Sequence, residues 1–203
     1  MDYLGELNAV VKRERALRQK FYEEITPEHK WEFINGEVIM HSTATAKHSV
    51  IRKRLERLIS TWVDVKHLGW SGGEKVLVVC QRNDYEPDIV FFGPKKARSI
   101  RPDTLKFPAP DCAIEILSKS TQKNDRGIKF RDYAAHGVAE YWIVDPVKEI
   151  IEQYLLGEDG GYELVLKARD GTVQSSAIPG FVMPVRAAFE DQENLKALWA
   201  LKP

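Results

Sequence analysis

The sequence predicts an α/β fold in which a core of order α-β-β-β-α-β forms a mixed sheet flanked by helices. Three observations support this prediction. An amphipathic stretch at residues 48–65 is followed by three short apolar runs, and a second helical stretch at residues 125–136 precedes a further apolar run at residues 140–144. The chain has 203 residues, of which 43% are hydrophobic and 30% charged, a composition typical of a soluble globular protein with one domain.

The N-terminal part is predicted to add a helical segment and a hairpin. Residues 3–23 form a charged stretch with apolar residues near helical spacing: Leu4, Leu7, Val11, Leu17 and Phe21. Thr26 and Pro27 are residue types of a helix cap and a first helical position, so a short second helix is expected there. Residues 31–40 are predicted to form a β-hairpin, because Asn35-Gly36 is a strong signal for a two-residue turn.

The core elements follow in order. Residues 48–65 carry apolar side chains at helical period, with basic residues between them. Strands are expected at residues 75–80, 88–92 and 112–117. The helix at residues 125–136 ends before Gly137, a residue type that commonly follows a helix C-terminus, and a strand at residues 140–144 completes the core.

The C-terminal part is predicted to be a β-hairpin extension followed by a helix. The hairpin strands are residues 150–156 and 162–167, joined by a turn at residues 158–161. Residues 178–181 form a loop and residues 190–201 a helix. With no linker in sight, we expect a single domain with an N-terminal helical extension (1–24), a core (25–185) and a C-terminal helix (186–203).

Several classes of protein are excluded by composition. Two cysteines, Cys80 and Cys112, cannot build a disulfide framework or a four-ligand zinc site. Both lie in apolar runs, which indicates buried thiols in a reducing compartment and hence a cytoplasmic protein. The N-terminus has no apolar segment of signal-peptide length, and no stretch approaches the roughly 20 apolar residues of a membrane span.

The zero net charge hides an uneven distribution. Residues 47–131 hold 18 Lys and Arg against 10 Asp and Glu, whereas residues 132–203 hold 6 against 12. Three basic clusters lie in the central segment, at residues 47–57, 95–106 and 119–131. Such a surface suits a polyanion such as DNA or RNA, bound mainly through phosphate contacts. The alternative is that each cluster is an ordinary solvated face.

Two carboxylates interrupt apolar strands. Asp88 lies at the start of one predicted strand, and Glu115 lies in the middle of another. A carboxylate in a core strand is costly unless it is paired or binds a metal. If the strands are neighbours, the two acids can converge on a hard cation such as Mg²⁺. Lys129 and Tyr133 share a helix face shortly downstream, and two acids with a lysine suit metal-assisted phosphodiester hydrolysis.

Each of these residues also has an ordinary structural interpretation. Asp88 could cap or turn its strand, and Glu115 could pair with a buried arginine such as Arg126. Lys129 could be a solvated helix lysine, and Tyr133 could pack in the core with a hydrogen-bonded hydroxyl. The combination of the residues, rather than any one of them, therefore indicates a site.

Five ordered motifs resemble the Uma2 family, a family of nuclease-like proteins in the PD-(D/E)XK superfamily. They lie at residues 31–38, 86–91, 114–121, 125–133 and 137–146, and the resemblance spans about residues 25–185. The resemblance implies a restriction-endonuclease-like core that hydrolyses DNA with Mg²⁺ or Mn²⁺. It also implies that Asp88, Glu115 and the backbone carbonyl of Ile116 hold the metal, with Glu32 as a further ligand or a supporting residue.

The sequence departs from the superfamily pattern at the lysine. That lysine normally stands two residues after the glutamate, a position taken here by Leu117. The resemblance implies that Lys129 of the following helix replaces it, and Lys129-x-x-x-Tyr133 is similar to the Q-x-x-x-Y helix of RecB-type nucleases. Lys119 stands where the family commonly has proline, which should alter the loop more than the chemistry.

We therefore expect a metal-dependent endodeoxyribonuclease with Asp88, Glu115 and Lys129 as catalytic residues and Tyr133 supporting them on the helix face. DNA phosphates are expected to bind at a set of basic residues: His48, Arg52, Lys53, Lys119, Lys123 and Arg126. The helix at residues 3–23 would mediate a homodimer, although its apolar stripe could instead be covered within the monomer. The alternatives are an inactive nuclease-fold module that binds nucleic acid or protein, and a subunit active only with a partner.

Overall fold

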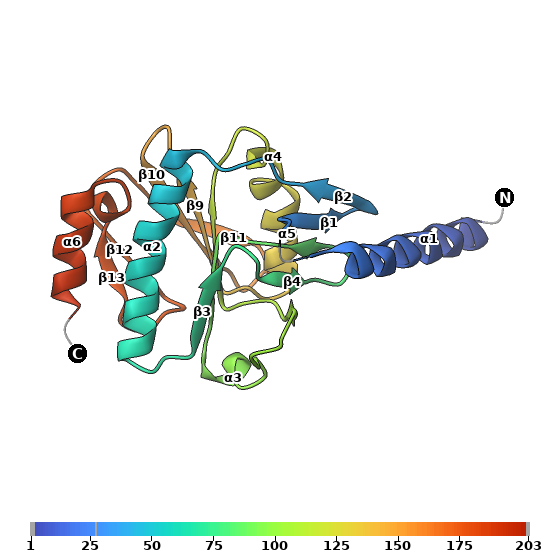
Figure 1. Cartoon of the computed structure of the whole chain (residues 1–203), viewed down its shortest axis with the longest axis horizontal. Coiled ribbons are helices and arrows are strands. Elements are labelled where there is room, and N and C mark those ends of the chain that lie inside the picture. The colour runs from blue at the N-terminus through green and yellow to red at the C-terminus, as the bar shows by residue number, and fades with distance from the viewer. Residues whose placement is uncertain (1–2, 27, 202–203) are drawn as a thin grey trace.

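The computed structural model describes residues 3–26 and 28–201 and contains two larger β-sheets packed against each other and flanked by helices, together with a small two-stranded sheet (Figure 1). The larger sheet has the strand order β11-β10-β9-β8-β6-β3. Its strands are β3 (Trp70–Gly73), β6 (Ile89–Phe92), β8 (Cys112–Ile116), β9 (Glu140–Asp145), β10 (Ile150–Leu156) and β11 (Tyr162–Ala168). Only β8 and β9 run parallel within this sheet, as expected for two strands joined through a helical crossover.

The smaller sheet has the order β2-β1-β5-β4-β7. Its strands are β1 (Trp31–Ile34), β2 (Glu37–Met40), β4 (Leu77–Val79), β5 (Asp84–Tyr85) and β7 (Lys106–Phe107). The β1–β2 hairpin turns at Asn35 and Gly36, whose φ angles of 51° and 85° are those of the turn that Asn-Gly sequences favour. The hairpin predicted from this dipeptide is confirmed.

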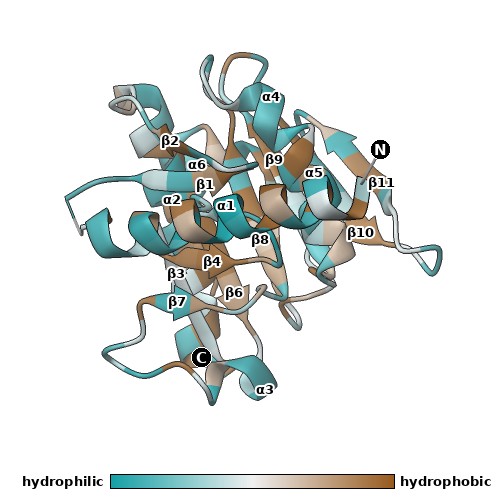
Figure 2. Cartoon of the chain, turned by 90° about the vertical axis from the view of Figure 1, so that its right-hand side faces the viewer, coloured by the Kyte–Doolittle hydropathy of each residue, from teal (hydrophilic) through white to brown (hydrophobic). Residues whose placement is uncertain are grey.

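The helices cover opposite faces of the larger sheet. Helix α2 (Ala46–Val65) lies on one face, where its buried stripe packs on the sheet together with residues from the C-terminal part of the chain. The opposite face packs against α5 (Ile128–Ala135) and the smaller sheet. Hydrophobic residues accordingly concentrate in the central strands (Figure 2). Because both faces of the sheet are covered, side chains on both sides of β6 and β8 are buried, which accounts for the continuous apolar runs of these strands.

The remaining elements lie around this core. They are α1 (Tyr3–Glu24), α3 (Pro94–Ala97), α4 (Gln122–Asp125), the small hairpin of β12 (Thr172–Gln174) and β13 (Val182–Pro184), a 3₁₀ turn (Val185–Ala188) and α6 (Asp191–Ala200). Figure 1 shows α1 projecting away from the body, with the C-terminal helix α6 at the opposite end. Cys80 and Cys112 are free and buried, as expected. Of the described helices, none is long and apolar enough to cross a membrane.

The expected α/β class is confirmed, as are a strand within residues 75–80 and a helix within residues 125–136. The sheet to which that strand belongs and the start of that helix differ from the prediction, and the prediction of a short helix after Thr26 is wrong. The segment at residues 75–80 contributes β4 to the smaller sheet, and the edge strand of the main sheet is β3, which lacks alternation because it contains Gly72 and Gly73. The helix predicted at residues 125–136 is broken at Arg126 and Gly127 into α4 and α5. No helix follows Thr26 in the described residues 28–30, where His29 closes a turn onto the Thr26 carbonyl; Pro27 lies outside the described residues.

Candidate active site

Asp88 directly precedes strand β6, and Glu115 lies within the neighbouring antiparallel strand β8. In the pairing of β6 with β8, Ile89 is opposite Ile114, so Asp88 and Glu115 are opposite each other at the next position. Both side chains are buried, with exposed fractions of 3%. The N–H of Ile116 donates to Asp88 Oδ2 at 2.8 Å, which brings the backbone of Ile116 to the same point. The structure thus brings together the two acids that the sequence singles out.

A buried lysine joins three carboxylates above this strand pair. Lys129, only 1% exposed, extends from α5 and places its Nζ 2.7 Å from Glu32 Oε1, 3.0 Å from Glu115 Oε1 and 3.2 Å from Asp125 Oδ1. Glu32 comes from β1, so the lysine links the smaller sheet to the larger one. Lys129 is therefore a buried, ion-paired residue, and the solvated-lysine alternative is wrong.

The other helix residue of the pair, Tyr133, has both roles that the sequence allows. Its hydroxyl donates to Glu115 Oε1 at 3.1 Å, while its ring packs in the core against Tyr85 and Tyr141. Arg126, offered by the sequence as a partner of Glu115, instead pairs with Glu152 on β10. Leu117, which continues β8 beyond Glu115, packs in the same apolar cluster as Tyr133.

Asp88 has a lysine and a histidine as neighbours of its own. Lys30, just before β1, places Nζ 2.8 Å from Asp88 Oδ1, and His48, in the first turn of α2, places Nε2 3.2 Å from Oδ2. A second histidine, His41, stands 3.1 Å from Glu32 Oε2. The sequence did not single out Lys30 or His41, since a lysine before a strand and a histidine after a hairpin carry no local signal.

Burial and neighbouring charges shift the pKa values within the site in opposite directions. Burial, reinforced by the carboxylates of Asp125, Asp88 and Glu32, raises the pKa of Glu115 to about 8. Burial opposes ionisation of Glu32 also, but Lys129 and His41 outweigh it and lower the pKa of Glu32 to about 2. Burial would lower the pKa of Lys129, but the surrounding carboxylates hold that pKa well above its usual value. Two acids with pKa values pushed apart are typical of functional sites.

One further carboxylate at the site is incompletely paired. Glu86, which immediately precedes Pro87 and Asp88, is 3% exposed, and its Oε2 has no hydrogen-bond partner among the described residues. Burial raises the pKa of Glu86 to about 7. Its backbone N–H donates to Glu32 Oε1 at 3.0 Å. Buried polar atoms without partners are uncommon in folded proteins, so stability alone does not explain why a glutamate lies at this position.

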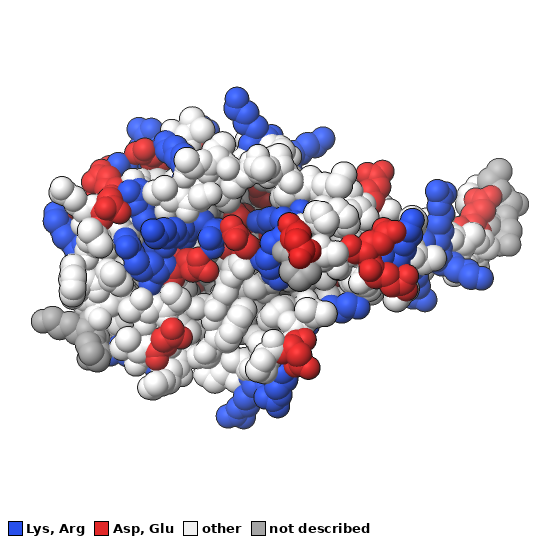
Figure 3. Space-filling view, viewed as in Figure 1, with Lys and Arg blue, Asp and Glu red and all other residues white. Residues whose placement is uncertain are grey.

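The predicted phosphate-binding residues divide between ion pairs and open surface. Arg52 pairs with Glu56 and Glu74, and Arg126 pairs with Glu152. Lys53, Lys119, Lys123 and Arg126 are exposed, the last of them in spite of its ion pair. Basic side chains gather on the face over which α2 runs, with acidic side chains among them (Figure 3).

The donor set fits a hard divalent cation bound by few protein ligands. Within residues 3–26 and 28–201, no group of three or more His, Cys, Asp or Glu side chains is arranged to hold a metal ion. Mg²⁺ is commonly bound through one or two carboxylates and keeps several waters, so the carboxylates of Asp88 and Glu115 are ligands of the kind that it takes. The ammonium of Lys30 lies against Asp88, so a positive charge already contacts this carboxylate.

The chain was compared with protein families, with other sequences and with solved structures, and each comparison found a similar protein or family. Residues 18–186 match the model of the Uma2 family, described as "Putative restriction endonuclease". A protein of Synechocystis sp. named "Uncharacterized protein slr1290" is 29% identical over 136 residues, which cover 66% of this chain and 70% of the relative. The crystal structure of a "putative nuclease belonging to DUF820" from Anabaena variabilis superposes with a TM-score of 0.72 at 20% identity, covering 89% of this chain and 97% of the other.

Proposed function

Because the chain belongs to the Uma2 family, a family of nuclease type, we propose that it is a Mg²⁺-dependent endonuclease that hydrolyses the phosphodiester bonds of DNA, with Mn²⁺ as a substitute ion. The observation that carries the proposal is the buried pair Asp88 and Glu115, opposite each other on neighbouring strands beside a buried lysine. A fold of this kind supports many functions, so the proposal depends on this site.

The metal would be held by Asp88, Glu115 and the backbone carbonyl of Ile116. When bound, the cation polarises the phosphate and lowers the pKa of its water. Glu32 lies against Lys129 and His41, so we assign it the role of positioning the lysine rather than that of a ligand. Lys30 would leave Asp88 Oδ1 when the cation enters.

Lys129 would act as a fixed positive charge. The carboxylates around it hold its pKa well above the usual value, so the ammonium keeps its proton near neutral pH and does not serve as a general base. It donates hydrogen bonds, which can orient the attacking water, and its charge stabilises the negative charge that develops on the phosphate oxygens.

The DNA backbone would be followed by the basic residues at the edges of the site. Lys53, Lys119 and Lys123 are exposed and suited to contact phosphates, which position a duplex without reading its sequence. Arg52 and Arg126 could exchange their carboxylate partners for phosphates, and His48 would stand between the DNA and Asp88. A homodimer that cuts both strands is part of the same proposal.

One observation favours a second candidate, an inactive module that binds nucleic acid or protein. The carboxylate oxygens of Asp88 already contact Lys30, His48 and the Ile116 N–H, so the carboxylate is paired without a metal. In that case the site would stabilise the fold and the basic surface would bind a partner without cleavage.

A cleavage assay separates the two candidates. Supercoiled plasmid, linear duplex, single-stranded DNA and RNA are incubated with the protein and Mg²⁺, Mn²⁺, Ca²⁺ or EDTA. The proposal expects DNA cleavage with Mg²⁺ or Mn²⁺, none with EDTA, and none by folded Asp88→Asn. Binding of the plasmid without cleavage under every ion would instead support the inactive module.

A further inference from the structure

The first half of α1 extends beyond the body of the protein. The helix is attached through its second half, where Arg18 donates to Asp84 and to the carbonyl of Cys80, and Phe21 packs on Phe33. Glu14 accepts from Arg82 Nε at 2.9 Å. N-terminal to these contacts the helix projects into solvent (Figure 1). A free helix of this length would be marginal in water, so its projecting half needs a partner.

One face of the projecting half is apolar. Tyr3, Leu4, Leu7, Val10 and Val11 are spaced three and four residues apart, and their exposed fractions are 70%, 75%, 59%, 54% and 38%. A stripe of this kind normally faces another packed element. Large apolar patches on a soluble surface mark interaction sites, and this one is contiguous along about two helical turns.

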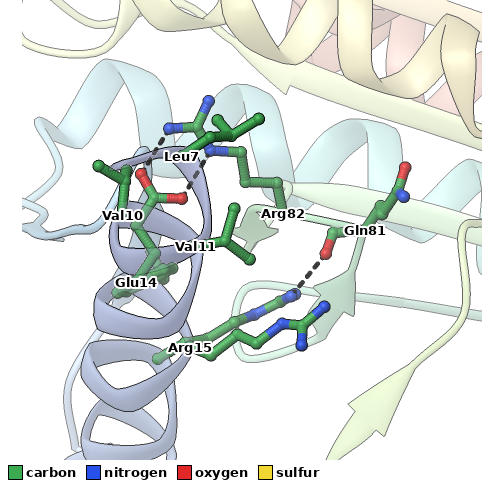
Figure 4. A pocket seen from close by; sticks show the side chains of 9 residues that line it. Leu7, Val10, Val11, Glu14, Arg15, Gln81 and Arg82 are labelled. Carbon is green, nitrogen blue, oxygen red and sulfur yellow. Dashed lines mark hydrogen bonds and ion pairs between the residues drawn. The ribbon is translucent and has the colours of Figure 1, made fainter. Parts of the chain in front are cut away.

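The stripe continues into a cavity where the helix meets the body. The cavity measures about 400 Å³ and is lined by Leu7, Val10 and Val11 on one side and by Phe33, Gln81 and Arg82 on the other. Figure 4 shows Leu7 and Val11 pointing from α1 toward the side of Arg82. Leu7, Val10, Val11 and Phe33 form the apolar part of this lining, which can contact apolar side chains from outside, and the remaining lining residues are polar or charged: Glu14, Arg15, Arg18, Gln81 and Arg82.

We propose that the stripe is covered by α1 of a second copy of this chain, packed antiparallel. The charges beside the stripe support this occupant. Glu6 and Arg13 project from the same flank of the helix, two turns apart, so an antiparallel pair centred between residues 9 and 10 brings Glu6 of each copy beside Arg13 of the other. A parallel pair would instead oppose Glu6 to Glu6 and Arg13 to Arg13.

The same register accounts for the cavity. It alternates Leu7 of one copy with Val10 and Val11 of the other, and it places Leu4 and Tyr3 of the second copy opposite residues 15 and 16, next to Arg15 of the cavity lining. The alternative occupant is an anionic membrane surface, which would suit the basic residues Lys12, Arg13 and Arg15 of the same helix; the vesicle experiment below separates the two. The inference rests on α1 alone and does not depend on nuclease activity.

The first experiment measures mass in solution by light scattering over a range of concentrations. We expect the wild type to have about twice the 23.2 kDa mass of the chain. Leu7→Glu/Val11→Glu should weaken association by roughly 10²-fold or more, about tenfold or more for each apolar side chain removed from the contact. Leu105→Glu, at a residue that is 78% exposed elsewhere, is the matched control and should remain dimeric.

The second experiment tests the antiparallel register. Glu6→Arg and Arg13→Glu should each weaken the dimer, and the double variant should restore it. Val10→Cys should form a disulfide between copies, whereas Leu4→Cys should not, since in this register residue 4 of one copy lies roughly 16 Å along the axis from residue 4 of the other, eleven residues at 1.5 Å each. Circular dichroism confirms that each variant is folded.

Several outcomes would overturn the proposal. A wild-type monomer at all concentrations, or a dimer unaffected by Leu7→Glu/Val11→Glu, would exclude α1 as the contact. Efficient Leu4→Cys cross-linking would exclude the antiparallel arrangement. Sedimentation of a wild-type monomer with anionic vesicles would assign the stripe to a membrane surface instead.

Discussion

Replacing Glu115 by Gln should abolish tight binding of Mg²⁺ or Mn²⁺ without weakening the metal-free protein. The substitution keeps the size of the side chain and its hydrogen bond from Tyr133 while it removes one of two anionic ligands. Because burial raises the pKa of Glu115 to about 8, the metal-free protein at pH 7 already holds a neutral carboxyl there, and Gln resembles that state.

The magnitude follows from the same pKa. A group with a pKa of about 8 is about 90% protonated at pH 7 and about 10% protonated at pH 9. A cation binds the carboxylate, so binding should release about 0.9 proton at pH 7 and about 0.1 at pH 9 from this residue. The raised pKa also means that the wild type loses stability as pH rises from about 4.5 to 8, a loss that Glu115→Gln escapes.

Isothermal titration calorimetry in two buffers of different ionisation enthalpy measures both the affinity and the number of protons released. We expect the release to vanish in Glu115→Gln together with tight binding. Glu152→Gln, a carboxylate on β10 paired with Arg126, is the control and should bind the cation like the wild type. Unchanged affinity in Glu115→Gln, or no proton release by the wild type at pH 7, would refute the reasoning.

Three further predictions follow. Lys129→Ala should lower the cleavage rate by roughly 10²–10⁴-fold in single-turnover assays with cation affinity retained. It should also cost about 3–5 kcal/mol in urea denaturation, because three buried carboxyl groups, of which Glu32 is ionised, lose their partner. Wild-type cleavage by this variant would exclude the lysine. Gly73→Ala should destabilise by about 1–3 kcal/mol and weaken cation binding, because the added Cβ would lie 2.2 Å from the Asp88 carbonyl oxygen; an unchanged urea midpoint would contradict this. Burial opposes ionisation of Glu152, but hydrogen bonds from neighbouring arginine and lysine side chains lower its pKa to about 2, so the stability that this carboxylate contributes is present above pH 4.5 and lost as pH falls to 2. Glu152→Gln should therefore cost about 1–2 kcal/mol of folding stability at pH 7, allowing for solvent screening, and almost nothing at pH 2. An equal cost at both pH values would show that the ion pair contributes nothing.

The parts of the fold with strong local signals could be predicted from the sequence. The Asn35-Gly36 turn is set by two residues that adopt positive φ readily, and α2 has an uninterrupted helical period over 20 residues. Strand β3 could not be predicted, because Gly72 and Gly73 carry no side-chain pattern. These glycines are needed for tertiary packing, since the absence of a side chain at Gly73 allows the backbone of Asp88 to approach closely.

The candidate site shows the same division. Asp88 and Glu115 stand out because each interrupts an apolar run, and their pairing follows from strand adjacency. Lys30 and His41 reach the site from the hairpin of the smaller sheet, which the sequence does not place against the larger one. Which basic side chain contacts which carboxylate depends on that packing, and no spacing along the chain encodes it.

The central claim is that Asp88 and Glu115 hold the divalent cation used for hydrolysis. Anomalous diffraction from crystals grown with Mn²⁺ tests it most directly. We predict one strong peak in contact with both carboxylates, with Lys30 Nζ displaced from its 2.8 Å contact with Asp88, and no such peak in Glu115→Gln. A peak elsewhere in the protein, or none under conditions in which the wild type cleaves DNA, would contradict the claim.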